Sequence, residues 1–255
     1  MANKRNNSGR KLLTVGPDAP FQFTEAYKSL RTNLEFLSAT TGAKIILVTS
    51  SVPEEGKSNV AVNLAMTMAE SGRRVVLMDG DLRKGTLSRY LHIPASHPGI
   101  TSRIAGSADW QDVLVPMKKS SLVVLPTGPL PPNPAEMLGS DRMQKLFAGL
   151  RDYAEYVIVD TPPVTVVTDA TIMSRWADGV VLVVRPGVTM IQNAQLSKKN
   201  LEAVDAKILG VVVNGYDAKK SNRKDGYYYT YSYDNYYSDE NARTEESKNM
   251  SRKRK

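Results

Sequence analysis

Six short apolar runs constrain the fold of this chain more than any other feature. Each run is rich in Val, Ile and Leu and lacks the alternation with polar residues that marks a half-buried strand. Such runs are typical of strands buried on both faces, as in a parallel sheet covered by helices. The runs are residues 45–49, 75–78, 122–125, 157–159, 180–184 and 208–213. We therefore predict an α/β fold with a doubly wound, mainly parallel sheet flanked by helices.

The charge of the chain lies at its two ends. Lys and Arg total 34 and Asp and Glu total 26, a net charge of +8. Residues 1–11 carry four basic and no acidic side chains, residues 12–216 carry 20 and 19, and residues 217–255 carry ten and seven. We expect a basic N-terminal extension at 1–23, a folded domain at 24–216 and a disordered tail at 217–255. Because the folded part is nearly neutral, nucleic acid is not an expected partner.

The composition excludes several classes of chemistry. The absence of cysteine excludes disulfides, thiolate metal sites and cysteine nucleophiles. With only His92 and His97, a histidine metal site or a Ser-His-Asp triad is disfavoured. The polar N-terminus is not followed by the apolar region of a signal peptide, and the longest apolar runs fall far short of the roughly 18 residues that would suggest a membrane span. We expect a cytoplasmic protein, held at any membrane by something else.

A phosphate-binding loop directly follows the first apolar run. Residues 51–58 read Ser-Val-Pro-Glu-Glu-Gly-Lys-Ser, and a helical stretch at 58–71 follows, closed by Gly72. Backbone N–H groups at such a helix start wrap a phosphate, Lys57 reaches the β- and γ-phosphates, and the Ser58 hydroxyl binds Mg²⁺. The expected nucleotide contacts are Ser51, Pro53, Glu54, Glu55, Gly56, Lys57, Ser58 and Asn59.

Two further runs end in carboxylates. The run at 75–78 leads into Asp79 and Asp81, and the run at 157–159 leads into Asp160. Parallel sheets bind ligands at the edge where their strands end, so these carboxylates are expected to converge on the metal and the phosphates. If the strand stays extended through both, Asp79 and Asp81 project the same way. Ordinary solvated turns are the alternative explanation.

The three carboxylates can divide two roles between them. We assign Asp79 as the base that accepts a proton from an attacking hydroxyl, with the reverse assignment to Asp81 left open. Asp81 and Asp160, together with Ser58, are assigned as metal organisers. Arg83 is expected to orient Asp81 or a phosphate.

Residues 24–38 predict an amphipathic helix. Glu25, Lys28 and Arg31 fall on one face, which by itself indicates a plain solvated face. The other face carries an apolar stripe at three- and four-residue spacing. The stripe consists of Tyr27, Leu30, Leu34 and Leu37.

Tyrosine is concentrated in the tail. Seven of the twelve tyrosines fall within residues 227–237, where no apolar neighbours could build a core around them. Exposed phenols beside an ATP site predict phosphoacceptors; a stacking platform for single-stranded nucleic acid or sugars, or a low-complexity tail, are the alternatives. The candidates are Tyr227, Tyr228, Tyr229, Tyr231, Tyr233, Tyr236 and Tyr237.

Residues 51–58, 75–83 and 157–163 together resemble the Walker A, Walker A′ and Walker B motifs of the bacterial tyrosine kinases (BY-kinases) of capsule and exopolysaccharide biosynthesis. The resemblance covers essentially the whole chain. It implies a P-loop fold of the MinD/ParA type and transfer of the γ-phosphoryl group of ATP, with Mg²⁺, to tyrosine hydroxyls.

The resemblance also implies how the protein assembles. Glu25-x-x-Lys28-x-x-Arg31 matches a family motif that builds a ring-shaped homo-oligomer, within which the tail is phosphorylated between subunits. Lys28 departs from the arginine of that motif, and lysine cannot form the bidentate fork of an arginine. By resemblance to the wider fold, Arg185 and Asn214 are expected near the adenine.

Further partners are implied in the same way. The first is a separate membrane-spanning activator of the polysaccharide co-polymerase type, which would recruit the kinase to the inner face of the cell membrane. The others are protein tyrosine substrates and a phosphotyrosine phosphatase. The rival interpretation is a MinD/ParA-like positioning ATPase that binds membrane or DNA. Those ATPases share a second lysine five positions before the Gly-Lys-Ser lysine, and this chain has Val52 there. A nucleotide-switched scaffold without catalysis is a third interpretation.

Overall fold

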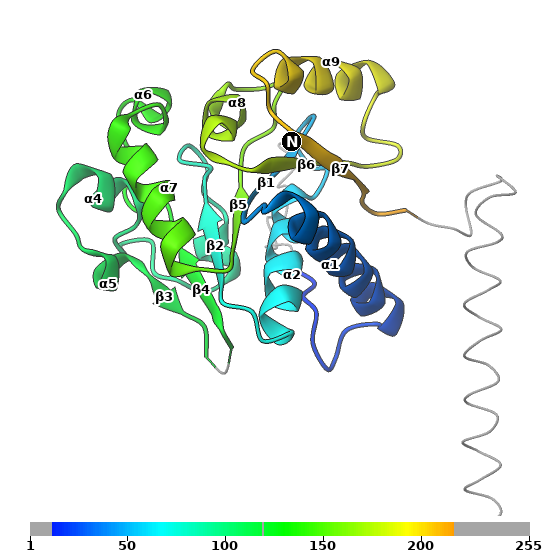
Figure 1. The fold of residues 1–255 in the computed structure, drawn as a ribbon, viewed down its shortest axis with the longest axis horizontal. Helices are drawn as coiled ribbons and strands as arrows, with labels where there is room; N and C mark the ends of the chain where they lie inside the picture. The colour runs from blue at the N-terminus through cyan, green and yellow to red at the C-terminus, as the bar shows by residue number, and fades with distance from the viewer. Residues whose placement is uncertain (1–11, 119, 217–255) are drawn as a thin grey trace, which may run out of the picture. The chain divides into compact units, whose positions relative to one another are not determined.

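The computed structural model of the chain describes residues 12–118 and 120–216. Its strands are β1 (Ile45–Ser50), β2 (Val75–Asp79), β3 (Val115–Pro116), β4 (Leu122–Leu125), β5 (Tyr156–Asp160), β6 (Gly179–Val184) and β7 (Ile208–Val213). They form one seven-stranded sheet in the order β3-β4-β2-β5-β1-β6-β7 (Figure 1). Neighbouring strands are parallel except β3 and β4, which are antiparallel. The predicted α/β fold with a mainly parallel sheet is confirmed.

All six predicted strands are present, and the structure adds one that the sequence analysis missed. β3 pairs Val115 and Pro116 with β4 at one edge of the sheet. Two residues are too short to produce an apolar run. Proline suits an edge strand because it has no N–H group to donate to a second neighbour.

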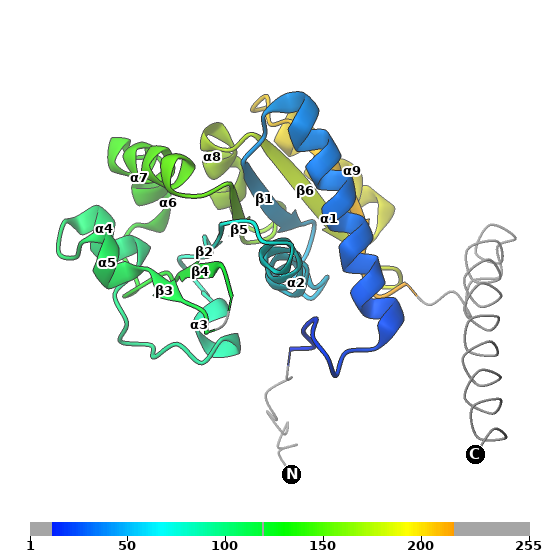
Figure 2. The same ribbon diagram turned by 60° about the horizontal axis from the view of Figure 1, so that its bottom comes forward.

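Helices cover both faces of the sheet (Figure 2). One face is covered by α1 (Phe21–Thr41), α2 (Lys57–Glu70) and α3 (Leu87–Tyr90), which share an apolar cluster with the strands. The other face is covered by the helices that follow α3, in a second cluster. They are α4 (Ile100–Ala105), α5 (Trp110–Val113), α6 (Pro134–Leu138), α7 (Asp141–Tyr153), α8 (Asp169–Met173) and α9 (Ile191–Glu202), with a 3₁₀ turn at Ser174–Trp176.

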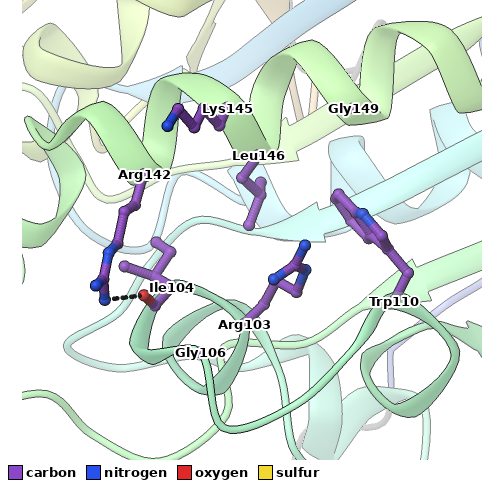
Figure 3. Close-up of a pocket in the computed structure, with 8 residues that line it drawn as sticks. All are labelled: Arg103, Ile104, Gly106, Trp110, Arg142, Lys145, Leu146 and Gly149. Atoms are coloured by element: carbon purple, nitrogen blue, oxygen red, sulfur yellow. Dashed lines mark hydrogen bonds between the residues drawn. The ribbon is translucent and has the colours of Figure 1, made fainter.

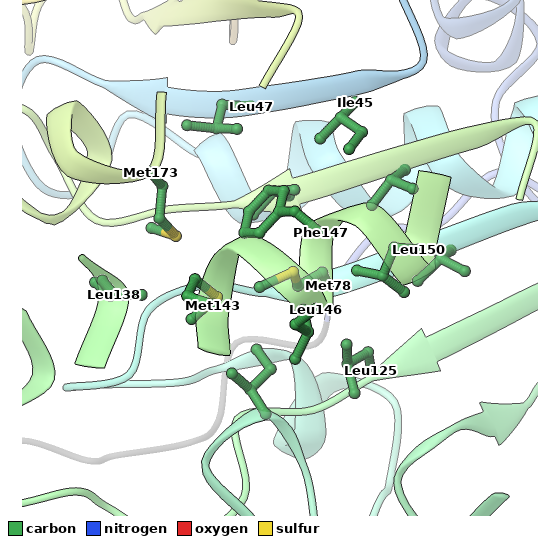
Figure 4. Packing of buried hydrophobic residues seen from close by; sticks show 14 of the residues in the cluster. Ile45, Leu47, Met78, Leu125, Leu138, Met143, Leu146, Phe147, Leu150 and Met173 are labelled. Atoms are coloured by element: carbon green, nitrogen blue, oxygen red, sulfur yellow. The ribbon is translucent and has the colours of Figure 1, made fainter. Parts of the chain in front are cut away.

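The second cluster anchors the strands that carry the site. Phe147 and Leu150 of α7 pack toward Ile45 and Leu47 of β1, and Met78 of β2 lies beside them (Figure 4). All five side chains are buried. Full burial of such a side chain contributes roughly 1.5–3 kcal/mol, so this cluster fixes β1 and β2 against α7.

The expectation that every apolar run is buried on both faces is wrong for β7. Val211 and Val213 are 57% and 53% exposed, whereas the residues of β1 and β2 are all buried. β7 is the outermost strand and has a neighbour only in β6. An unbroken run of Val and Ile therefore does not distinguish a central parallel strand from an edge strand.

The N-terminal part packs against α2. The α1 helix begins three residues earlier and ends three residues later than predicted, and Gly42 follows it in a left-handed conformation (φ 70°). Tyr27 and Leu34 of the predicted stripe are buried, while Leu37 is 37% exposed. Ahead of α1, the Val15 N–H donates to Asn63 Oδ1 at 2.7 Å. The chain thus joins the folded domain before residue 24.

The chain divides into two units, Met1–Asn214 and Gly215–Lys255. Only Gly215 and Tyr216 of the second unit are among the described residues, so the predicted disorder of residues 217–255 lies outside them. Within the described part of the chain, none of the helices combines the length and the apolar character needed to cross a bilayer.

Candidate active site

The phosphate loop connects β1 to α2 as predicted. Gly56 precedes the first residue of α2 with φ 88°, and Glu54 has φ 68°. Both angles lie in the left-handed region, which glycine enters freely and other residues rarely enter. A Cβ at position 56 would also stand 2.1 Å from Asn214 Nδ2. Glycine is required here because both the turn and the close approach of Asn214 leave no room for a side chain.

Glu55 holds the loop in shape from inside. Its side chain is fully buried, and its Oε2 accepts a hydrogen bond from the Val52 N–H at 2.9 Å. The Thr189 hydroxyl donates to the other carboxylate oxygen. Thr189 was not among the predicted site residues, and a single threonine between β6 and α9 gives no sequence signal. Glu55 therefore shapes the loop through contacts within the protein.

Lys57 and Ser58 face the end of β5. Lys57 Nζ lies 3.0 Å from Ser58 Oγ and 3.3 Å from Asp160 Oδ1. Burial by itself would lower the pKa of Lys57, but the nearby Asp160, Asp81 and Asp79 together raise it. The lysine is thus held charged, close to the serine hydroxyl that the sequence assigned to the metal.

Asp79 is the last residue of β2 and lies opposite Asp160 in the register of the sheet. Its Oδ2 accepts a hydrogen bond from the Leu87 N–H at 3.0 Å. Burial, reinforced by the negative charge of Asp160, raises the pKa of Asp79 to about 8. A carboxyl group with a pKa this close to neutral pH exchanges protons readily, as a general base must.

Asp160, like Asp79, is a fully buried carboxylate. Burial raises its pKa, although Lys57 opposes the shift. Its Oδ1 faces Lys57, while its Oδ2 is buried without a hydrogen-bond partner. A buried carboxylate oxygen without a partner is costly, so Oδ2 is available to a ligand.

β2 ends at Asp79, so the extended strand assumed for Asp79 and Asp81 stops before Asp81. Asp81 instead bends into a turn in which its Oδ1 accepts from the Lys84 N–H at 2.9 Å and the Arg83 N–H at 3.3 Å. The two carboxylates still lie near the same group, because both raise the pKa of Lys57.

The Arg83 guanidinium does not orient Asp81. It forms a bidentate pair with Asp169 at the start of α8, with Nε–Oδ2 and Nη2–Oδ1 distances of 2.8 and 3.0 Å. Asp169 is fully buried and was missed by the sequence analysis. Its position 86 residues away along the chain gives no pairing signal. The pair fastens the turn after β2 to α8.

The residues expected near the adenine lie against the phosphate loop. Arg185 Nη1 donates to the Glu54 carbonyl at 3.3 Å, and Asn214 Nδ2 donates to the Glu55 carbonyl at 2.9 Å. The Asn59 side chain points elsewhere: its Oδ1 accepts from the Tyr27 hydroxyl at 3.0 Å. The predicted nucleotide contact of Asn59 could therefore come from its backbone but not from its side chain.

A cavity of about 490 Å³ opens beside Asp79. Its lining includes the basic side chains Arg83, Lys84 and Arg89 and no acidic residue. Gly85, which also lines it, lies so close to Asp79 that a Cβ there would stand 3.0 Å from Asp79 Oδ2. Asp79 itself is fully buried and does not line the cavity, so the turn at Gly85 stands between the carboxylate and the cavity.

The predicted contact surface on α1 makes bonds within the chain. Lys28 Nζ lies 2.7 Å from Glu25 Oε1, and Arg31 Nη1 donates to the Thr67 carbonyl of α2 at 3.2 Å. Its role in assembly stays a prediction. The seven tail tyrosines lie outside the described residues.

The site fits a magnesium–nucleotide complex. Among the described residues, no group of three or more His, Asp or Glu side chains is placed to hold a metal ion by itself. Mg²⁺ commonly binds one or two carboxylates together with substrate phosphates and water, so such a cage is not needed. The unpartnered Asp160 Oδ2 and the Ser58 hydroxyl are suitable oxygen donors.

The loop between β1 and α2, with carboxylates at the ends of β2 and β5, defines a P-loop NTPase. A family model described as ParA, NUBPL iron-transfer P-loop NTPase, matches residues 42–243. The tyrosine-protein kinase YwqD of Bacillus subtilis is 38% identical over 81% of this chain and 86% of its own length. The putative tyrosine-protein kinase CapB of Staphylococcus aureus is 31% identical over 88% of this chain and 99% of its own.

Solved structures agree with these relatives. The kinase domain of Escherichia coli ETK is 34% identical, with a TM-score of 0.74 over 78% of both chains. The cell-division ATPase MinD of Pyrococcus furiosus is 25% identical, with a TM-score of 0.59 over 71% of this chain and 74% of its own. The chain belongs to the ParA family of P-loop NTPases and, within it, to the bacterial tyrosine-protein kinases. It spans about 30% of full-length etk from Escherichia coli K12.

Proposed function

We propose that this kinase transfers the γ-phosphoryl group of Mg-ATP to tyrosines of its own C-terminal cluster, acting between subunits. The observation that carries the proposal is the position of Asp79. Its carboxyl group, with a pKa of about 8, lies near Lys57 on one side, and on the other side it lies next to Gly85, which lines the basic cavity. A phenol that enters this cavity would reach Asp79 once the turn at Gly85 moves aside.

Each side chain has a part in the transfer. The loop N–H groups and Lys57 hold the phosphates, and Ser58, Asp81 and Asp160 would hold Mg²⁺, which would supply positive charge near the phosphate oxygens. Asp79 takes the proton of the tyrosine hydroxyl while the hydroxyl oxygen forms a bond to the γ-phosphorus. The bond between that phosphorus and the bridging oxygen breaks, and ADP leaves with the bonding electrons. Arg185 and Asn214 brace the loop beside the adenine.

The wider setting follows the relatives. Names such as CapB, and the CpsD kinases of Streptococcus agalactiae, support a role in capsular or exopolysaccharide synthesis or export. The chimerical protein CapA2B2, 34% identical with a TM-score of 0.72 over 77% of this chain and 85% of its own, supports a separate activator chain. We propose that such a membrane-spanning activator recruits the kinase to the inner face of the membrane. Glu25, Lys28 and Arg31 would form the ring contact, and a phosphatase would reverse the modification.

The test uses two complementary chains. A Lys57→Met chain keeps its tyrosines but cannot transfer phosphate, while an active chain carries phenylalanine at all seven tail positions. Mass spectrometry after incubation with Mg-ATP should find phosphate on the tail of the inactive chain. Phosphate on the wild type alone would show that the tail reacts in its own active site, and an unphosphorylated wild-type tail would refute the proposal.

A further inference from the structure

A second basic cavity lies away from the nucleotide site, between α4, α5 and α7 (Figure 3). Its volume is about 310 Å³, at the lower end of the roughly 300–1,000 Å³ typical of ligand pockets. Arg103, Trp110, Arg142 and Lys145 line it together with apolar side chains such as Leu146. No acidic residue contributes to this lining.

The cations of this cavity lack counter-charges. In the described part of the chain, Arg103, Arg142 and Lys145 form no ion pair. Arg142 Nη1 donates to the Ile104 carbonyl at 2.8 Å, which positions its guanidinium at the cavity. Arg103 Nε is buried and has no hydrogen-bond partner. Three neighbouring cations, one with a buried unpartnered N–H, favour an anion as the ligand.

The indole of Trp110 provides a flat wall. The Arg103 guanidinium lies 5.3 Å from its ring centroid, within the range of a cation–π contact. Gly149 of α7 makes room for the ring, because a Cβ there would stand 2.8 Å from Trp110 Cζ2. Glycine within a helix is less favourable than alanine. The close packing of α7 against the indole accounts for its presence.

The combination points to a phosphorylated aromatic ring. A phosphomonoester carries a charge of about −1.5 to −2 near neutral pH and three acceptor oxygens, which suits a cluster of guanidinium and ammonium groups. The Trp110 indole, which is only partly buried, offers apolar surface to the ring that bears the phosphate. The reaction proposed above makes this chemical group, phosphotyrosine.

We propose that this cavity binds a phosphotyrosine of the C-terminal cluster, from the same chain or from a neighbour. The proposal rests on the proposed tail phosphorylation for its ligand. β7, which leads to the tail, is five strands from β4, a separation of roughly 24 Å. The thirteen residues from Asn214 to Tyr227 can span at most roughly 45 Å. The product would thereby be drawn away from Asp79, Asp81 and Asp160, which repel it.

Binding can be measured without catalysis. The full-length Lys57→Met chain is titrated with a fluorescent synthetic peptide of residues 225–239 that carries phosphotyrosine at position 233, and anisotropy reports binding. The unphosphorylated peptide should bind at least tenfold more weakly. With Trp176→Phe added, Trp110 is the sole tryptophan, and its fluorescence should change on titration.

Variants locate the site. Lys145→Gln and Arg103→Gln should each weaken binding of the phosphopeptide about tenfold, the loss expected for one charge-assisted contact. Arg175→Gln is the matched control, because Arg175 stacks on Trp176 at 5.5 Å and does not line the cavity. It should leave binding unchanged. Circular dichroism checks that each variant is folded. If Arg103→Gln unfolds, Lys145→Gln still tests the cavity, because the Lys145 side chain makes no bond in the described structure.

The outcomes separate the two proposals. Equal affinity in all variants, or for the unphosphorylated peptide, would overturn the cavity as the binding site. Equal affinity for a scrambled phosphotyrosine peptide would overturn the assignment to the tail and favour phosphotyrosine of another protein. After incubation with Mg-ATP, the wild type should bind added phosphopeptide at least fivefold more weakly than the chain with phenylalanine in its tail. If mass spectrometry finds no tail phosphate, tail phosphorylation fails while the peptide titration still tests the cavity.

Discussion

Similar apolar runs form strands at the centre and at the edge of the sheet, but the residues at the ends of these strands differ in burial and in role. In β2 and β5, at the centre, an apolar run ends in a carboxylate that is fully buried, and burial raises the pKa of Asp79 and Asp160. In β7, at the edge, a similar run leaves Val211 and Val213 more than half exposed and is followed by Asn214, which braces the phosphate loop. Strand order decides whether the polar residue after a run is fully buried, as Asp79 and Asp160 are, or only partly buried, as Asn214 is.

Removing the central cation should have the largest effect. Lys57→Met is expected to reduce phosphoryl transfer by a factor on the order of 10³ or more, because it removes the cation held at the start of α2, next to Ser58 and Asp160. Transfer is measured with radiolabelled ATP. Lys198→Met, which alters a surface pair with Glu202, is the control and should leave the rate unchanged. Wild-type transfer by Lys57→Met would show that the loop lysine is not part of the machinery.

Next in size is the loss of the base. Asp79→Asn should slow transfer by roughly 10²–10⁴-fold while ATP affinity changes little, because a base acts in the transition state. Single-turnover kinetics measure the first quantity and nucleotide titration the second. A collapse of Mg-ATP affinity with modest slowing would instead make Asp79 the metal organiser and Asp81 the base.

The raised pKa of Asp79 should also be visible in pH dependence. As the pH falls below about 8, Asp79 becomes protonated, so kcat/KM should drop toward tenfold per pH unit. Stability should change in the opposite direction. Because the folded pKa exceeds the unfolded one, the native state binds the extra proton between about pH 4 and 8, and stability falls as pH rises through that window. Thermal melting of Asp79→Asn should therefore depend less on pH than that of the wild type; equal slopes would contradict the shift.

The smallest effect separates centre from edge directly. Val159→Thr places a hydroxyl in the buried β5 and should lower the free energy of unfolding by about 1–3 kcal/mol. Val213→Thr, at a position 53% exposed, should change it by less than about 0.5 kcal/mol. Urea denaturation measures both. Similar losses in the two variants would show that β7 is covered in the folded protein.

The sequence predicted what depends on neighbours along the chain. The strands at 45–49 and 75–78, the loop up to Ser58, and the left-handed Gly72 after α2 were all predicted, since periodicity and turn chemistry are local. The order of the strands in the sheet was not predicted, because the residues of an apolar run do not indicate which strands lie beside it. The exposure of β7 was missed for that reason.

Contacts between distant segments account for the other differences. Arg83 pairs with Asp169, and Glu55 is held by Thr189, across 86 and 134 residues of sequence. Neither partner belongs to a motif. The second basic cavity was invisible for the same reason: Arg103, Trp110 and Lys145 come together only when α4 and α5 pack under α7.

The hydrogen bond from Asn214 to the Glu55 carbonyl has a mechanical meaning. Asn214 is the last residue of the first structural unit, so the chain leaves the domain one residue after this bond. Any pull on the chain beyond Gly215 reaches Asn214 and the phosphate loop before it reaches the apolar clusters. A force on the chain after Gly215 would therefore act first on the Asn214–Glu55 hydrogen bond, and a change in that bond would alter the nucleotide affinity of the phosphate loop.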